Sequence, residues 1–409
     1  MILPLAFLAG SGVDQLALQM LLVFGAAKLL AELAERVRMP GIVGGLLSGI
    51  LLGPSLLNLI QYNDLLHALA ELGVMFLLFQ VGLEVKVSEL LRVGKTALLV
   101  AVSGVLVPFV MGYAIYIGAK HPQAEALFMG AAMVATSVGI TAQVLSSKGL
   151  LEHRTAKIIL GAAIIDDVLG LLVLAVVSSM GEGKGIDYTG LLTTTVVSIG
   201  FVVAIAKYGT DAARIVVPKL AERMRVPESE YAIAVTFLFG MALLASVSGV
   251  AAIVGAFLAG MALAEIASKR LHTLVHGAGE LMVPFFLASI GLQLDIHAFA
   301  SGSSLAMGIA ILIAAVNSKA LGCGAAAWRL GWKDAARIGI GMVPRGEVGM
   351  VIAQIGISRG AIGQEAYGVA VFMAVMTTVV APPLLNLVYK DIAKPAADVP
   401  PDEAPLHLG

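Results

Sequence analysis

Residues 160–177 read LGAAIIDDVLGLLVLAVV and hold two adjacent carboxylates, Asp166 and Asp167, in an otherwise uncharged apolar segment. An ionised aspartate at the centre of a membrane helix costs about 2.5–3.5 kcal/mol on insertion scales. Two such neighbours are therefore expected only where they pair with another charge, face a water-filled cavity or exchange a proton. We expect this pair to carry the function of the chain.

The composition predicts an integral membrane protein built from α-helices. Hydrophobic residues make up 59% of the 409 residues, charged residues make up 13%, and the mean hydropathy is +0.96. Soluble proteins are about 45–50% apolar. Hydrophobic runs of about 17–25 residues recur to about residue 389 and leave no room for a large soluble domain. The polar, Pro-rich segment 391–409 is expected to be a disordered tail.

The distribution of basic residues predicts how the chain crosses the membrane. With the N-terminus outside and the C-terminus in the cytoplasm, 20 of the 26 Lys and Arg residues lie in or beside cytoplasmic segments, where such residues collect. Only Lys120, Lys184 and Arg359 lie outside, and Lys28 is expected to reach the surface or to pair with Glu32, four residues away. Thirteen spans are predicted, at about 14–35, 40–60, 65–84, 93–118, 123–147, 154–180, 188–206, 229–248, 250–267, 272–293, 303–330, 334–358 and 365–389.

The charges deep inside the predicted spans do not balance. Asp166, Asp167 and Glu347 stand against Lys319 and Arg345, a net charge of −1. If the five groups lie close together, one carboxylate must bind a proton or a metal cation, and the two then compete for it. Competition of Na⁺ and H⁺ for one carboxylate, exposed first on one side and then on the other, is sufficient for antiport.

Two triples of predicted spans, 93–180 and 303–389, are weakly similar. Their offset of seven spans is odd, so the second triple must run through the membrane upside down, as in the inverted repeats of secondary transporters. The middle span of each triple contains a stretch that is poor as continuous helix, namely residues 136–141 (TSVGIT) and 341–349 (GMVPRGEVG). Non-helical backbone at membrane depth is expected to line a polar cavity inside the protein.

The two aspartates are expected to have different partners, because consecutive helical side chains point about 100° apart. Thr136, Ser137 and Thr141 are candidates for neutral oxygen ligands of a monovalent cation. Alternatively, these hydroxyls bond carbonyls one turn back within an ordinary helix. The sequence alone does not decide between the two.

Arg345 and Glu347 are two residues apart and would not face each other on a regular helix. We expect them to hold the two broken segments in place. The chain shows no nucleotide-binding loop, no catalytic triad, no nucleic-acid-binding surface and no convincing metal-ligand spacing. Its single cysteine, Cys323, excludes an internal disulfide. We therefore expect a protein that is not an enzyme, holds no cofactor, and has membrane lipid and small inorganic cations as its partners.

With these motifs the chain resembles the monovalent cation:proton antiporter family, specifically the NapA-type sodium/proton antiporters. The combination of IDDVLG and PRGEVG is highly specific. The stretches that carry the resemblance are GGLLSGILLGPSLL (44–57), ELGVMFLLFQVGLE (71–84), ATSVGITAQVL (135–145), ILGAAIIDDVLGLLVLAVV (159–177), SKALG around Lys319, and GMVPRGEVG (341–349).

The resemblance implies an all-α NhaA/NapA-like antiporter fold with thirteen transmembrane helices, inverted repeats and two crossing discontinuous helices. It implies a homodimer in which a core moves against a dimer scaffold like an elevator. The implied divisions are dimerisation helices 1–3 (1–91), core helices 4–6 (92–182), linker helix 7 (183–226), dimerisation helices 8–10 (227–298), core helices 11–13 (299–390) and the tail (391–409).

The resemblance also implies roles for single residues. Asp167 matches the main cation-binding carboxylate, here for Na⁺, and Asp166 matches the partner of Lys319 in the ion-free state. Arg345 and Glu347 match positions that support the crossing of the broken helices. An aspartate at 166, where the potassium-efflux branch often has glutamine, favours sodium, and a lysine at 319 matches the electrogenic type.

Three other functions were weighed against Na⁺/H⁺ exchange. A K⁺/H⁺ antiporter on the same scaffold is the nearest, because motifs do not resolve the ligand spacing that selects an ion. A cation channel is disfavoured because broken inverted repeats suit alternating access better than a continuous pore. An intramembrane aspartyl protease needs its two aspartates on facing helices, whereas Asp166 and Asp167 are neighbours on one.

Overall fold

The computed structural model describes residues 12–37, 39–86, 92–181, 188–294, 302–358 and 360–392. Within these ranges the regular secondary structure is helical throughout, in agreement with the all-α prediction. The helices are α1 (Gly12–Arg36), α2 (Gly41–Leu52), α3 (Asp64–Leu83), α5 (Gly94–Gly118), α6 (Gln123–Ala132), α7 (Val138–Ser147), α8 (Arg154–Gly181), α9 (Tyr188–Arg223), α10 (Ser229–Val247), α11 (Ala252–Leu263), α12 (Lys269–Leu292), α13 (Gly302–Ala326), the 3₁₀ turn η3 (Trp328–Leu330), α14 (Trp332–Gly341), α15 (Glu347–Ser358) and α16 (Gln364–Val388).

Seven of the described helices are long and apolar enough to cross a membrane alone. An eighth span results if the two segments of α9, bent by 49° at a break, count as one. A helix suits a bilayer because all its backbone groups are bonded within the segment. Several other apolar helices, such as α2 and α11, have only 12 residues. The count of thirteen spans remains a prediction. The predicted tail falls almost wholly on residues 393–409, outside the described ranges, as do Lys184 and Arg359.

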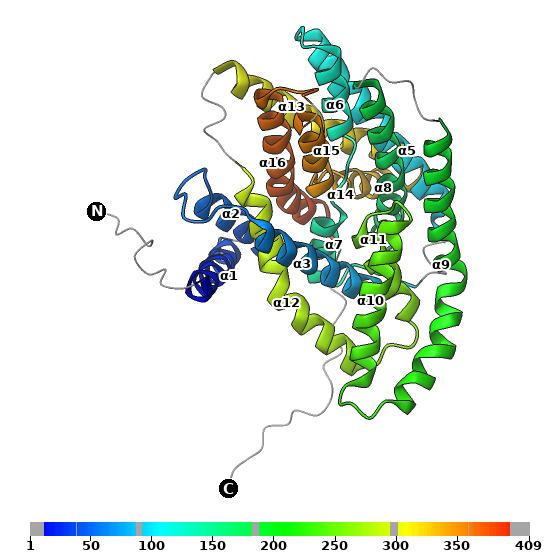
Figure 1. Cartoon of the computed structure of the whole chain (residues 1–409). Helices are drawn as coiled ribbons and strands as arrows, with labels where there is room; N and C mark the ends of the chain where they lie inside the picture. The colour runs from blue at the N-terminus through cyan, green and yellow to red at the C-terminus, as the bar shows by residue number, and fades with distance from the viewer. Residues whose placement is uncertain are drawn as a thin grey trace.

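The helices form two packed sets (Figure 1). The first, called here the scaffold set, contains α1, α2, α3, α10, α11 and α12. The second, the core set, contains α5 to α8 and α13 to α16. α9 runs along one edge of the molecule and packs on both sets, against α10, α11 and α8. Where the sets meet, α3 contacts α7 and α2 contacts α16.

Two pairs of scaffold segments match in sequence and in packing. Residues 71–83 (ELGVMFLLFQVGL) and 280–292 (ELMVPFFLASIGL) are identical at seven of 13 positions. α2 and α11 likewise share the pattern G-x-x-L-x-G-x-x-L. α2 packs on α1 and α12, whereas α11 packs on α10 and α3. The same contacts are therefore made twice, from segments far apart in the chain.

Close approach in these helix pairs depends on glycine. A Cβ atom on Gly49 of α2 would lie 1.9 Å from the carbonyl oxygen of Ala288 in α12. On Gly260 of α11 it would lie 2.2 Å from the carbonyl oxygen of Phe79 in α3. Small residues let helix backbones touch where lipid supplies no hydrophobic driving force. The scaffold helices therefore pack backbone against backbone.

The C-terminal end of α16 is held against α14 by a cluster of polar side chains. Arg337 of α14 donates to Asp391 at 2.5 Å, to Asp334 at 2.7 Å and to the carbonyl oxygen of Val388 at 3.1 Å. Lys333 donates to Asp391 at 2.9 Å. Hydrogen bonds from Lys333 and Arg337 hold the pKa of Asp391 at about 2, below its usual 3.8.

Gly260→Ala should destabilise the scaffold set, because the new methyl group meets backbone that cannot move aside. Overpacking of this kind costs about 1–3 kcal/mol. We expect a lower melting temperature of the purified protein in detergent. Gly240→Ala in α10 is the control, since a Cβ atom there meets nothing within 4 Å. Equal melting temperatures for the two variants would contradict the packing described.

Asp391→Asn should lower the melting temperature slightly at pH 7, because the exposed carboxylate loses its two cationic partners. The pKa of Asp391 is lower in the folded chain than in the unfolded one, so its contribution is complete above about pH 4 and is lost as pH falls toward 2. The difference between wild type and variant should therefore shrink over that range. Asp211→Asn, in a looser 3.9 Å pair with Arg214, is the control.

Candidate functional site

Four of the five charged groups predicted to lie deep in the membrane are buried in the core set. Lys319 and Arg345 have 0% exposure, Asp166 has 1% and Asp167 has 9%. The fifth group is the Glu347 side chain, which lies outside the described part of the structure. Its predicted role beside Arg345 therefore remains a prediction.

Lys319 and Asp166 form a buried ion pair between α13 and α8. The Lys319 Nζ atom lies 3.1 Å from Oδ1 and 3.3 Å from Oδ2 of Asp166. The two residues are 153 positions apart in the chain. The family resemblance predicts this pairing, and the structure brings the two groups together. An ammonium group without exposure to water needs such a partner, since an isolated buried charge is far too costly.

Asp167, the next residue on α8, faces the boundary between the two helix sets. It lines a narrow cavity of about 10 Å³ together with side chains from both sets, among them Leu78 of α3, Val138 of α7 and Phe257 of α11. That volume admits about one water molecule. The two aspartates therefore have different surroundings, as expected from their neighbouring positions on one helix.

The predicted interruptions meet beside this helix. The backbone is not helical at residues 133–137, between α6 and α7, or at residues 342–346, between α14 and α15. Residues 138–141 and 347–349, which belong to the stretches predicted to be poor helix, are helical. The Ser137 backbone N–H donates to the Pro344 carbonyl oxygen at 2.8 Å. A Cβ atom on Gly346 would lie only 2.6 Å from Ser137 Oγ. The two non-helical segments are therefore in direct contact.

The three candidate hydroxyl ligands differ in what they bond. Thr141 Oγ1 donates to the Gly341 carbonyl oxygen at 2.7 Å, which ties α7 to the end of α14. Neither Thr136 Oγ1 nor Ser137 Oγ has a hydrogen-bond partner among the described residues, although both atoms are buried. A buried hydroxyl normally finds a partner. Thr136 and Ser137 therefore have oxygen atoms available for a ligand or water, whereas the Thr141 proton is already used.

Arg345 is anchored to two core helices by contacts that sequence reasoning missed. Its backbone N–H donates to Thr377 Oγ1 of α16 at 3.1 Å, and Thr378 Oγ1 donates to its carbonyl oxygen. Its Nη2 atom donates to the Ala315 carbonyl oxygen of α13 at 3.3 Å. The sequence feature that could have revealed these contacts is the pair of adjacent threonines, Thr377 and Thr378, in the apolar middle of a span. These bonds fix the second interruption against α13 and α16.

Gly104 also lies near the site, and the sequence analysis did not identify it. It lies on α5, and a Cβ atom there would be 3.1 Å from Lys319 Nζ. No charge or motif marks this glycine in the sequence, where it is one of 46.

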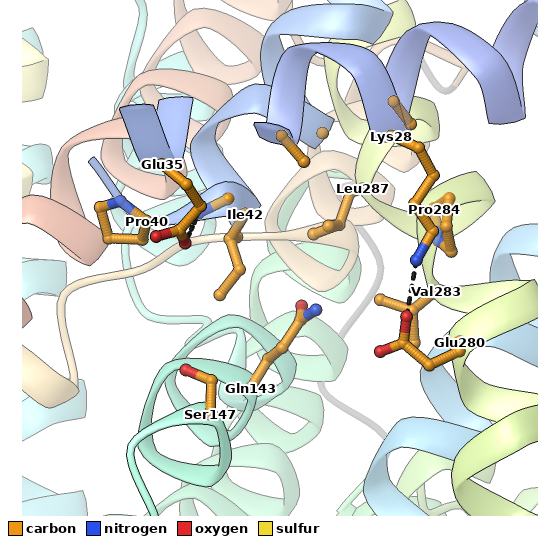
Figure 2. Close-up of a pocket in the computed structure, with 14 residues that line it drawn as sticks. Lys28, Glu35, Pro40, Ile42, Gln143, Ser147, Glu280, Val283, Pro284 and Leu287 are labelled. Atoms are coloured by element: carbon orange, nitrogen blue, oxygen red, sulfur yellow. Dashed lines mark hydrogen bonds and ion pairs between the residues drawn. The ribbon is translucent and has the colours of Figure 1, made fainter. Parts of the chain in front are cut away.

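A larger polar cavity of about 210 Å³ lies between α1, α2 and α12 of the scaffold set and α7 of the core set. Figure 2 shows Gln143 and Ser147 on one side and the ion pair of Lys28 with Glu280 on another. Lys28 Nζ lies 2.6 Å from Glu280 Oε2. Of the two expectations for Lys28, pairing with Glu32 is wrong, because the side chain turns toward α12 and Glu32 bonds Arg36 instead. The Lys28 side chain does reach the surface, with 44% of it exposed.

Comparison with known proteins agrees with this architecture. The family model for the transmembrane sodium/hydrogen exchanger matches residues 20–390. The Na(+)/H(+)-K(+) antiporter GerN of Bacillus cereus is 32% identical over 388 residues, which cover 93% of this chain and 98% of GerN. The high-affinity Na(+)/H(+) antiporter NhaS3 of Synechocystis sp. is 31% identical over 432 residues, which cover 95% of this chain and 93% of NhaS3.

A solved structure shares the fold. The sodium proton antiporter MjNhaP1 from Methanocaldococcus jannaschii matches with a TM-score of 0.66 at 18% identity, over 92% of this chain and 97% of that one. Residues 20–390, which the family model matches, include both interruptions, the aspartate pair and Lys319. The chain therefore belongs to the transmembrane sodium/hydrogen exchanger family, a family of multi-pass membrane transporters.

Proposed function

We propose that this protein exchanges Na⁺, or Li⁺, for H⁺ across the cell membrane, with cation and proton competing for Asp167. The observation that carries the proposal is the arrangement around α8. One aspartate is paired with a buried lysine at 3.1 Å, and its neighbour lines a cavity at the boundary between two helix sets. Its relatives GerN and NhaS3 are named as Na⁺/H⁺ antiporters, which supports the same exchange here.

The cation would be held by Asp167 and by neutral oxygens at the meeting point of the interruptions. Thr136 and Ser137 have buried hydroxyl oxygens without a hydrogen-bond partner among the described residues. Hard cations prefer such oxygen ligands. Thr141 would act indirectly, by tying the two interrupted segments together. When the cation leaves, a proton would neutralise Asp167, so that no bare charge crosses the membrane interior.

Lys319 would couple additional charge to the exchange. Cation binding beside Asp166 would weaken the hold of that carboxylate on the ammonium group, and Lys319 would then release a proton. More protons than Na⁺ ions would cross in each cycle, which makes transport electrogenic. Complete burial of Lys319 supports this role, because a neutral amine is far more stable there than an unpaired ammonium group.

Movement would occur between the scaffold set and the core set, in the manner of an elevator. The sets meet where α3 contacts α7 and α2 contacts α16, and Asp167 lies at their boundary. The matched scaffold segments and their paired packing support an inverted repeat of the kind found in secondary transporters. In this proposal the chain crosses the membrane thirteen times with its C-terminus in the cytoplasm, the interrupted helices cross, and the scaffold set forms a homodimer.

Exchange of K⁺ for H⁺ is the second candidate, because the relative GerN is a Na(+)/H(+)-K(+) antiporter. A panel of Na⁺, Li⁺ and K⁺ on purified protein in liposomes, at several pH values and with the membrane potential clamped, separates the two.

Asp167→Asn should abolish exchange, because an amide can neither take up a proton nor balance the charge of Na⁺. Proteoliposomes with an imposed pH gradient and an internal pH dye report the exchange as gradient dissipation on adding Na⁺. Gln143→Asn, in the polar cavity of Figure 2, serves as a control that shortens a polar side chain elsewhere in the core set. Full exchange by the Asp167→Asn protein would refute the assignment.

Lys319→Gln should lower the charge moved per cycle, because a neutral amide cannot release a proton. Transport currents on a supported membrane, divided by Na⁺ flux measured on the same preparation, give that ratio directly. We expect the ratio and the response to membrane potential to fall. An unchanged response to potential would rule out Lys319 as a proton carrier.

A further inference from the structure

The buried ammonium group of Lys319 occupies a space bounded by three helices. Asp166 of α8 supplies the opposite charge, at 3.1 and 3.3 Å from Nζ. On α13 itself, Cys323 lies one turn further along, and its thiol is directed to the Val100 carbonyl oxygen of α5 at 3.5 Å. The third helix, α5, contributes Gly104 at this point. The space therefore depends on a residue without a side chain.

The contacts that a side chain at position 104 would make show how tight this space is. A Cβ atom would lie 2.9 Å from Cys323 Sγ, 3.1 Å from Lys319 Nζ and 3.6 Å from Lys319 Cδ. Ordinary van der Waals contacts of Cβ atoms are at 3.4–4 Å. A methyl group would therefore press on both the sulfur atom and the ammonium group.

The two helices cannot easily separate to relieve this pressure. Ser103 Oγ of α5 donates to the Gly322 carbonyl oxygen of α13 at 2.7 Å. A Cβ atom on Gly322 would lie 3.1 Å from Val107 Cβ. One hydrogen bond and one close approach, both at Gly322, therefore hold α13 against α5 beside Gly104. The end of the Lys319 side chain is more flexible than the short side chain of Cys323, so the ammonium group would be displaced first.

We propose that Gly104 is a positioning residue for Lys319, whose missing side chain leaves room for the ammonium group to lie against Asp166. The inference rests on the proposed function, in which Lys319 gives up its proton during the cycle. The distances from Nζ to the two Asp166 oxygens, 3.1 and 3.3 Å, are already longer than the about 2.7–2.9 Å typical of hydrogen bonds between charged groups. A few tenths of an ångström of displacement therefore weakens the pair and makes the proton easier to release.

Gly104→Ala tests this directly. Na⁺-driven proton movement in proteoliposomes is measured against pH at saturating Na⁺. We expect the midpoint of the profile to move to lower pH by about 0.5–1 unit, less than the roughly 1–3 units that a whole adjacent charge contributes. Gly118→Ala is the control on the same helix, because a Cβ atom there meets nothing within 4 Å. Its profile should keep the midpoint of the wild type.

A second variant separates pressure on the sulfur atom from pressure on the ammonium group. In Gly104→Ala/Cys323→Ala the closest contact is gone, and only the flexible end of Lys319 must adjust, so this protein should fold even if the single variant does not. The shift in midpoint, measured against Cys323→Ala alone, should persist. A wild-type midpoint in either Gly104 variant, or a shift that disappears with the sulfur atom, would overturn the inference. Absence of Na⁺-driven proton movement in the wild type would instead refute the proposed function.

Discussion

The buried ion pair of Lys319 and Asp166 is the interaction on which the rest of the core set depends. Its two members come from α13 and α8, and neither is exposed to water by more than 1%. Removing either partner would leave an uncompensated charge, which costs about 3–5 kcal/mol in buried pairs. The pair therefore fixes how α8 and α13 lie, and with them the position of Asp167 at the boundary.

Hydrogen bonds between the two interruptions extend this constraint. Ser137 bonds Pro344 across the gap, Thr141 bonds Gly341, and the threonines of α16 bond the backbone at Arg345. Non-helical backbone inside a membrane is tolerated only where other protein groups satisfy it. These bonds meet that requirement and leave two hydroxyl oxygens directed to no other described group.

Much of this arrangement was predictable from the sequence, because charge in an apolar segment is a strong signal. Asp166, Asp167, Lys319 and Arg345 stood out for that reason, and Pro344 with its flanking glycines marked one interruption. Membership of the exchanger family is confirmed, as is the all-helical fold of the described residues.

Glycines gave no comparable signal, because close approach at Gly104 or Gly260 depends on which helices meet. The partner of Lys28, Glu280, could not be found from local spacing, because it is 252 residues away. The scaffold repeat, ELGVMFLLFQVGL and ELMVPFFLASIGL, was visible in the sequence but is conspicuous only once the matching packing is known.

Glycines at the helix contacts face either the backbone or the side chains of the neighbouring helix. Inside the scaffold set, Gly49 and Gly260 lie against carbonyl oxygens of the neighbouring helix, and inside the core set Gly339 lies against that of Ala320. At the boundary, a Cβ atom on Gly139 of α7 would instead meet side chains, at 3.2 Å from Val74 and 3.4 Å from Phe286. Displacing backbone contacts requires whole helices to separate, whereas side chains exchange rotamers within nanoseconds where they have room. In the proposed exchange cycle, movement of one set past the other would therefore displace side chains rather than backbone at this contact, on the boundary that Asp167 also lines.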